Sequence, residues 1–215
     1  QNGADAISTG NHIWDQRPIM NYIDSDPKLL RPLNFPEGTP GNGFGIYEAR
    51  SGKKVMVINA MGRVYMDPLD DPFAAIEKVL SKVSLGLDVS AVLVDFHGEA
   101  SSEKQAIGHV LDSRVSVVVG THTHVPTADY RILPGGTAYQ SDLGMTGDYN
   151  SVIGMQKKAA CGRFTTKLPQ ARLEPATGEG TLCGLLIETD DQTGWAKSAA
   201  PLRVGGSLIA TRPQV

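Results

Sequence analysis

Short apolar segments without regular polar alternation constrain the fold of this chain more than any other sequence feature. We predict strands over Lys54 to Ala60, Ala91 to Phe96, Val115 to Gly120 and Thr137 to Ser141. Segments of this kind, mostly rich in Val and Ile, are typical of strands that are covered on both faces of a sheet. We expect a further strand over Asp5 to Thr9, directly before the first histidine motif.

A helix is predicted after the first of the long strands, where Asp71 precedes Pro72. Aspartate is a good N-cap, and proline is favoured at the first helical position. Gly86 is a natural stop for this helix. The apolar residues of its buried face are Phe73, Ile76, Val79, Leu80 and Val83.

A second helix is expected from the capping-box spacing of Ser102 and Gln105. Its buried face is predicted to consist of Ala106, Ile107, Val110 and Leu111. A third helix is expected around Met155 to Phe164, and Leu182 to Glu188 with Trp195 to Ala199 predict a hairpin. Because strands alternate with helices and no break in composition marks a second domain, we predict a single α/β domain over residues 1–215.

The length and composition limit the class of protein. A chain of 215 residues with 40% apolar residues suits one domain with a buried core. A net charge of −3 gives no electrostatic footprint for nucleic acid, and no apolar run approaches the roughly 20 residues of a membrane span. The two cysteines, Cys161 and Cys183, form neither a disulfide framework nor a zinc-binding spacing. We therefore expect a soluble, cytoplasmic protein without a membrane partner.

Four of the five histidines lie in three short motifs, each directly after a predicted strand. The motifs are Gly10-Asn11-His12, Asp95-Phe96-His97-Gly98-Glu99 and Gly120-Thr121-His122-Thr123-His124. The carboxyl ends of strands in an open α/β sheet lie at the edge where ligands bind. Imidazole nitrogens suit zinc, manganese or iron, and an amide oxygen suits harder cations. The pattern therefore predicts a metal site at that edge.

The spacing of His122 and His124 is that of two side chains on one side of an extended segment, so one loop can present both to adjacent metals. A single histidine at a strand end is more often structural than a ligand, but three such motifs favour a metal site. His109 lies off the apolar face of its predicted helix, and we assign it no ligand role. Arg63 and Lys104 are candidate phosphate contacts, although a solvated surface charge is the commoner role.

These motifs resemble those of the calcineurin-like metallophosphoesterases, and most closely those of the bacterial YmdB-like phosphodiesterases. The superfamily carries Gly-Asn-His with a nearby acid, then a single histidine, then Gly-His-x-His. The YmdB-like branch is further indicated by Arg31-Pro32-Leu33-Asn34, Val57-Ile58-Asn59 and the stretch from Thr137-Ala138-Tyr139 through Gly144-Met145-Thr146-Gly147. The resemblance covers nearly the whole chain, and it implies a sandwich of mixed β-sheets flanked by helices.

The resemblance also implies a binuclear metal centre. Asn11, His97 and His122 would bind one divalent cation. His124 would help to bind the second. Manganese or iron is expected, with zinc or magnesium as alternatives.

For the reaction, the resemblance implies that a hydroxide bridging the two metals attacks phosphorus. His12 would not be a ligand but the general acid, which faces the scissile phosphate. Our hypothesis that Asp15 orients His12 by hydrogen bonding rests on their nearness in one turn. The implied substrates are small phosphodiesters, above all 2′,3′-cyclic nucleotides. Nucleotides derived from RNA are further candidates. The resemblance further implies a homo-oligomer.

The chain departs from the family pattern at its beginning. The family has an aspartate ligand and then a metal-bridging glutamate, in a Gly-Glu-Asn segment, before the Gly-Asn-His strand. Neither precedes Gly10 here, so we expect a chain that lacks the N-terminal strands of the family domain and an incomplete metal site. Asp95, Glu99 and Asp142 are internal carboxylates that could approach the metals.

Two other functions stay open. The chain could be a catalytically impaired regulatory or binding protein that keeps the fold, which an incomplete site favours. The presence of His12, whose implied role is catalytic rather than structural, argues against this. The chain could also be a metallohydrolase for amides or esters, against which the Gly-Asn-His element argues.

Overall fold

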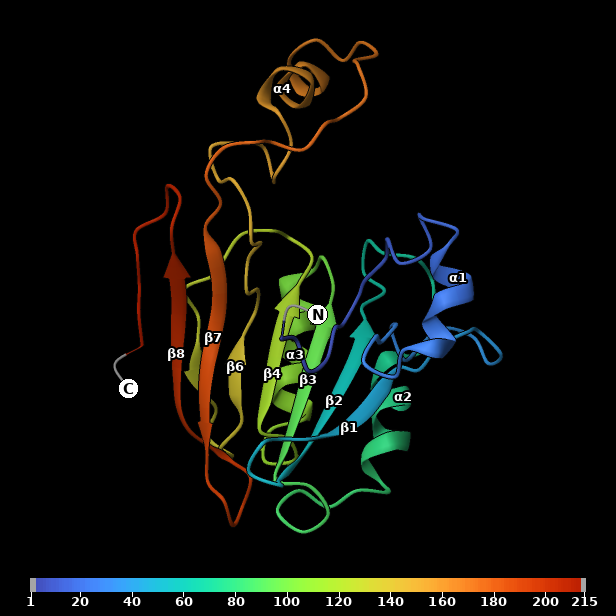
Figure 1. The fold of residues 1–215 in the computed structure, drawn as a ribbon, viewed down its shortest axis with the longest axis vertical. Helices are drawn as coiled ribbons and strands as arrows, with labels where there is room; N and C mark the ends of the chain where they lie inside the picture. The colour runs from blue at the N-terminus through green and yellow to red at the C-terminus, as the bar shows by residue number, and fades with distance from the viewer. Residues whose placement is uncertain (1–2, 214–215) are drawn as a thin grey trace.

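A six-stranded mixed β-sheet is the centre of this computed structural model, which describes residues 3–213 (Figure 1). Its strands are β1 (Phe44–Glu48), β2 (Lys54–Met61), β3 (Ala91–His97), β4 (Val117–Thr121), β5 (Arg131–Ile132) and β6 (Ala138–Gln140). The strand order is β1-β2-β3-β4-β6-β5, in which β2, β3, β4 and β6 are parallel and the two edge strands are antiparallel to their neighbours. The four long predicted strands are thus confirmed to within two residues at each end.

Two helices, α2 (Pro72–Leu80) and α3 (Ser101–Val110), cover one face of this sheet. Asp71 caps α2 as predicted, because its carboxylate accepts hydrogen bonds from two amides of the first turn. The helix ends well before the expected stop at Gly86, and Val83 packs on the core from the following turn. The main core between helices and sheet includes Met56, Ile58, Val92, Val94, Phe96 and Val118 from the strands, with Ile76, Val79, Leu80, Ile107 and Leu111 from the helical side.

A hairpin covers part of the opposite face. Its strands β7 (Leu182–Thr189) and β8 (Ala196–Val204) pair antiparallel, as predicted, although β8 continues past the expected end at Ala199. A second core cluster lies between the hairpin and the sheet, and it comprises Val117, Val119 and Ala138 packed against Leu93, Leu143, Leu185, Ile187, Ala196 and Ala199. Strands β4 and β6 are therefore covered on both faces, as their unalternated apolar sequences indicate. The second face of β3 is only partly covered, because Leu93 and Asp95 line an open pocket.

The predicted strand over Asp5 to Thr9 is wrong. Ile7 makes one isolated parallel bridge to Leu29 instead of a continuous ladder. A side chain holds this segment against the sheet in place of further backbone pairing, because the Ser8 hydroxyl donates to the carboxylate of Asp95. The segment is therefore extended chain that is fixed by a polar contact.

The start and the buried face of α3 also differ from expectation. The N-cap is Ala100, so Ser102 lies inside the helix and forms no capping box. The predicted core residues Ala106 and Val110 are exposed. The buried residues are instead Lys104, Ile107, Gly108 and, just after the helix, Leu111. The helix approaches the sheet so closely at Gly108 that a Cβ there would lie 2.6 Å from the ring of Tyr139. This close approach places Gly108, rather than Ala106 and Val110, on the buried side of the helix.

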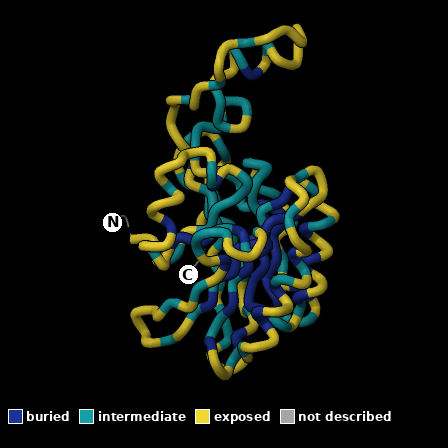
Figure 2. The backbone as a smooth tube through the Cα atoms, turned by 90° about the vertical axis from the view of Figure 1, so that its right-hand side faces the viewer, coloured by how far each residue is buried: buried dark blue, intermediate teal, exposed yellow. Residues whose placement is uncertain are grey.

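The remaining helices lie away from the sheet (Figure 1). A short α1 (Ile19–Tyr22) is followed by a 3-10 turn (Ile23–Ser25). The predicted third helix is α4 (Lys157–Thr165), and it projects from the body on a segment from Ser151 to Ala176 that we call the α4 arm. Within the arm, all of which is described, only Ala160 is buried, and Figure 2 shows this part of the molecule as mostly exposed. Among residues 3–213, no helix has the length and hydropathy needed to span a bilayer.

Replacing Asp71 with alanine will lower the free energy of unfolding by about 1 kcal/mol, because the amides of Phe73 and Ala74 lose their acceptor. Urea denaturation measures this change. Asp71→Asn is the matched control, since asparagine caps equally well but loses the exposed ion pair with Arg63. We expect this variant to stay within about 0.5 kcal/mol of wild type. An equal loss in both variants would contradict the capping role.

Candidate metal centre

The carboxyl ends of β3 and β4 bring two histidine motifs side by side. In this parallel pairing, His97 at the end of β3 lies opposite Thr121 at the end of β4, and His122 follows directly. The first motif reaches the same edge because Gly10 has no side chain, since a Cβ there would lie 2.2 Å from His97 Nε2. The three motifs therefore meet at one edge of the sheet.

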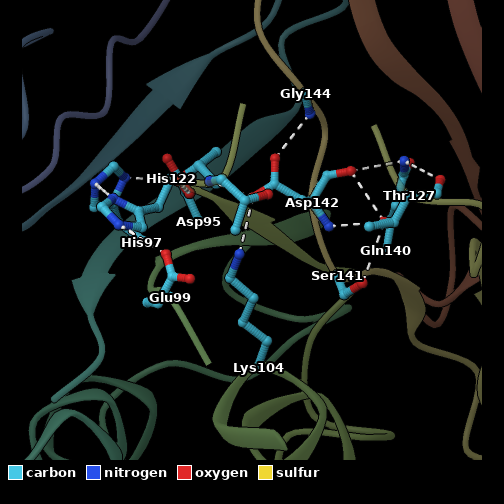
Figure 3. Close-up of polar contacts among 12 residues, drawn as sticks. Asp95, His97, Glu99, Lys104, His122, Thr127, Gln140, Ser141, Asp142 and Gly144 are labelled. Carbon is cyan, nitrogen blue, oxygen red and sulfur yellow. Dashed lines mark hydrogen bonds and ion pairs between the residues drawn. The ribbon is translucent and has the colours of Figure 1, made fainter. Parts of the chain in front are cut away.

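Three of the predicted ligands lie together, because the His97 ring contacts both Asn11 and His122. His97 Nε2 is 2.9 Å from Asn11 Oδ1 and 3.2 Å from His122 Nδ1. The two imidazole rings meet edge to face, with their centroids 4.9 Å apart (Figure 3). On the other side of its ring, His122 Nε2 lies 3.2 Å from Glu99 Oε2. Two imidazole nitrogens and one amide oxygen therefore lie together.

The two separations from His97 Nε2, one to Asn11 Oδ1 and one to His122 Nδ1, are compatible with a shared cation. Ligand atoms about 2.1 Å from a metal lie about 3.0 Å apart in octahedral geometry and about 3.4 Å apart in tetrahedral geometry. The separations of 2.9 Å and 3.2 Å agree with these values. No group of three His, Cys, Asp or Glu side chains in residues 3–213 converges as a metal site. Asn11 Oδ1 is the candidate third donor beside the two imidazole nitrogens.

A threonine and an aspartate set the orientation of the His97 ring. Thr121 Oγ1 donates to Asp95 Oδ1 at 2.8 Å and lies 3.0 Å from His97 Nδ1. A hydroxyl that donates its hydrogen bond to the carboxylate can accept one from His97 when the ring carries its hydrogen on Nδ1. This tautomer directs the lone pair of Nε2 toward the cluster. The Ser8 hydroxyl donates to the other oxygen of Asp95 and holds the carboxylate from the opposite side.

Burial shifts the protonation of these groups. It raises the pKa of Asp95 to about 6, although hydrogen bonds from Ser8 and Thr121 act in the opposite direction. Burial, with the neighbouring His122, lowers the pKa of His97 to about 3. Burial also lowers the pKa of His122, against the opposing effect of Glu99. Both rings are therefore neutral near pH 7, and the neutral imidazole is the form that binds metals.

The loop after β4 has a strained backbone. His122 and His124 have φ angles of 108° and 67°, in a region that costs a non-glycine residue roughly 1–3 kcal/mol. His124 Nδ1 donates to the carbonyl of Ile153, 2.8 Å away in the α4 arm. No hydrogen bond or ion pair among the described residues joins His124 to the other predicted ligands. The structure thus places His124 in the same loop as His122 but not in the cluster.

His12 lies at the exposed side of the site. Its Nδ1 is 2.9 Å from Asp15 Oδ2, with the two side chains 77% and 61% exposed. This is the contact that the spacing of the two residues led us to expect. Because Asp15 engages Nδ1, Nε2 is the ring atom that can exchange a proton with a bound molecule.

Two residues near the site differ from what the sequence suggests. Lys104 is neither solvated nor a phosphate contact, because its ammonium group pairs with Asp142 at 2.8 Å in the interior. Helix α3 turns this residue toward the sheet, which the helical pattern alone does not reveal. Arg63 is exposed and pairs with Asp71. The sequence motifs alone did not identify Thr121 as a hydrogen-bond partner of His97. The two residues end neighbouring parallel strands, and this alignment could have identified the pair.

Comparison with known proteins shows the family of this chain. The model of the YmdB-like protein family matches residues 1–202. A 2′,3′-cyclic-nucleotide 2′-phosphodiesterase of Bacillus subtilis (strain 168) is 50% identical over 193 residues, which cover 90% of this chain and 72% of that protein.

Two solved structures have the same fold. A hypothetical protein from Thermus thermophilus has a TM-score of 0.87 and 41% sequence identity, over 95% of this chain and 78% of that chain. A novel phosphatase of Mycoplasma pneumoniae has a TM-score of 0.83 and 31% identity, over 94% of this chain and 72% of that chain. The mixed α/β fold expected from the alternation of strands and helices is therefore confirmed, and the chain belongs to the YmdB-like family.

Proposed function

We propose that this chain is a metal-dependent phosphodiesterase that hydrolyses small phosphodiesters, with 2′,3′-cyclic nucleotides as its substrates. The observation that carries the proposal is the contact of Asn11, His97 and His122 at the sheet edge. Half of the residues aligned with the B. subtilis 2′,3′-cyclic-nucleotide 2′-phosphodiesterase are identical, which supports the same substrate class. RNA-derived nucleotides with a cyclic phosphate belong to this class.

The proposal includes two divalent cations. Asn11, His97 and His122 would hold one of them, and His124 would help to hold the second through Nε2, since its Nδ1 is engaged by Ile153. Manganese or iron suits this mixture of imidazole and amide ligands, with zinc or magnesium as alternatives. When bound, such cations neutralise phosphate charge and lower the pKa of water to near 7.

His12 is the proposed general acid. Its exposed ring can face a phosphodiester at the mouth of the site, and Asp15 would hold the ring through Nδ1. A protonated Nε2 would then give its proton to the departing alkoxide oxygen. General acid catalysis of this kind contributes roughly 10²–10⁴-fold to the rate.

The proposal also includes a cytoplasmic location and a homo-oligomer. The thiols of Cys161 and Cys183 are unpaired with each other, which agrees with a reducing compartment. The oligomer is a prediction from the family resemblance.

His97→Ala and His122→Ala will each lose bound metal and hydrolysis of 2′,3′-cyclic AMP together, because each removes a proposed ligand. Elemental mass spectrometry after loading with Mn²⁺ measures the metal content, and a phosphate-release assay with a phosphomonoesterase measures turnover. His109→Ala is the matched control, since this histidine is exposed on α3. Full metal content in both ligand variants would contradict the assignment. Full metal content without any hydrolysis in the wild type would favour a binding protein.

His12→Ala will lower kcat by about 10²–10⁴-fold and leave the Mn²⁺ content unchanged, because the proposed role is proton transfer rather than ligation. Asp15→Asn will reduce kcat less, since it weakens only the orientation of the ring. The same assays measure both variants. Loss of metal from His12→Ala would make His12 a ligand, and normal kinetics in Asp15→Asn would remove the orienting role.

Thr121→Val will weaken Mn²⁺ binding by about 10–100-fold, because His97 loses the hydroxyl that fixes its tautomer. Thr121→Ser keeps the hydroxyl and should bind as the wild type does. Isothermal titration of metal-free protein with Mn²⁺ measures both affinities. Wild-type affinity in the valine variant would show that the hydroxyl does not orient the ring.

A further inference from the structure

Lys104 and Asp142 form a buried ion pair, which Figure 3 shows, and this pair contacts the loop that carries His122 and His124. Lys104 Nζ is 2.8 Å from Asp142 Oδ2, and the two side chains are only 3% and 2% exposed. In every other ion pair of residues 3–213, both side chains are at least 22% exposed. Because buried charges lose much of their hydration, an ion pair of this kind contributes little net stability compared with apolar residues. Its presence therefore points to a role other than stability.

The carboxylate of Asp142 binds the histidine loop as well as the lysine. Asp142 Oδ2 accepts a hydrogen bond of 2.9 Å from the backbone amide of Thr123, the residue between the two histidines. Asp142 Oδ1 accepts a second hydrogen bond of 2.9 Å from the amide of Gly144. One carboxylate thus fixes the loop after β4 to the segment after β6.

The lysine fixes the carboxylate from the helix side. The stem of Lys104 runs beneath the end of β4, where a Cβ at Gly120 would lie 3.0 Å from Lys104 Cδ and 1.8 Å from the carbonyl oxygen of Ser141. Only glycine fits at this crossing, so helix, strand and loop approach closely at one point. The position of the ammonium group is therefore set by the packing of α3 on the sheet.

The loop needs such a restraint. His122 and His124 both adopt left-handed φ angles, and a backbone of this kind persists only where surrounding contacts impose it. The Thr123 amide is the hydrogen-bond donor between these two strained residues, and its acceptor is Asp142.

We propose that Lys104 and Asp142 are positioning residues, which hold the loop so that His122 faces His97 and the proposed metal. The inference rests on the proposed function for the metal, but it concerns contacts that this chain makes without one. Neither side chain is a ligand in this account. The pair acts through the Thr123 amide.

The first test is made on the metal-free protein. Lys104→Met alone leaves a buried carboxylate without its partner and is expected to unfold the protein easily. The test variant is therefore Lys104→Met/Asp142→Leu, which removes both charges. Ile107→Ala is the matched control, because it damages the core one turn further along α3 without touching the loop. Nuclear magnetic resonance measures hydrogen exchange of the Thr123 amide and the ring signals of His122 and His124.

In the double variant, we expect Thr123 to exchange at least tenfold faster than in the wild type and the His122 signals to shift or broaden. The signals of His109 should stay unchanged. In Ile107→Ala, exchange at Thr123 should stay close to wild type. Equal loss of protection in both variants, or wild-type protection in the double variant, would overturn the inference.

The second test is Mn²⁺ affinity by isothermal titration. We expect the double variant to bind Mn²⁺ about 10–100-fold more weakly, as other positioning residues around metals do, and Ile107→Ala to bind normally. Wild-type affinity in the double variant would overturn the inference. A wild-type protein that binds Mn²⁺ without hydrolysing 2′,3′-cyclic AMP would contradict only the proposed function. A wild-type protein that binds no Mn²⁺ would likewise contradict the proposed function, and hydrogen exchange at Thr123 would then confirm or overturn the positioning role by itself.

Discussion

The parallel pairing of β3 with β4 is the constraint on which the rest of the site depends. The ladder sets His97 opposite Thr121, and apolar cores on both faces of the sheet hold the two strands. A shift of one residue would turn His97 to the other face and separate it from Thr121, and it would also move the neighbouring core residues from one apolar cluster to the opposite face of the sheet. Hydrophobic burial therefore controls the geometry of polar groups that take no part in the core.

Two buried carboxylates support the cluster in different ways. Asp95 acts on a side chain, because it accepts the hydrogen bond of the Thr121 hydroxyl and so favours the His97 tautomer with hydrogen on Nδ1. Asp142 acts on the backbone, because it holds the Thr123 amide. Each carboxylate has several donors around it, which offsets the cost of its burial.

The sequence predicts well those features that local interactions decide. Four long strands, the cap at Asp71 and the hairpin follow from neighbouring residues. Two of the three motifs meet because the ends of β3 and β4 share one edge, whereas the first motif follows an extended segment that is not a strand. The sequence predicts poorly what packing between distant segments decides. The face of α3 depends on the close approach at Gly108, and the burial of Lys104 depends on a partner 38 residues away. The contact of His124 depends likewise on a carbonyl of the α4 arm, which no spacing rule relates to the motif.

The α4 arm and the central sheet differ in the free energy that is needed to unfold them. With a single buried residue, the arm exposes little apolar surface when it unfolds, so its opening costs far less free energy than melting of the sheet. We therefore expect the arm to open locally before the sheet unfolds, so a Tm would describe the sheet rather than the arm. Since the carbonyl that holds His124 belongs to the arm, that histidine loses this contact when the arm opens, while His97 stays with the sheet.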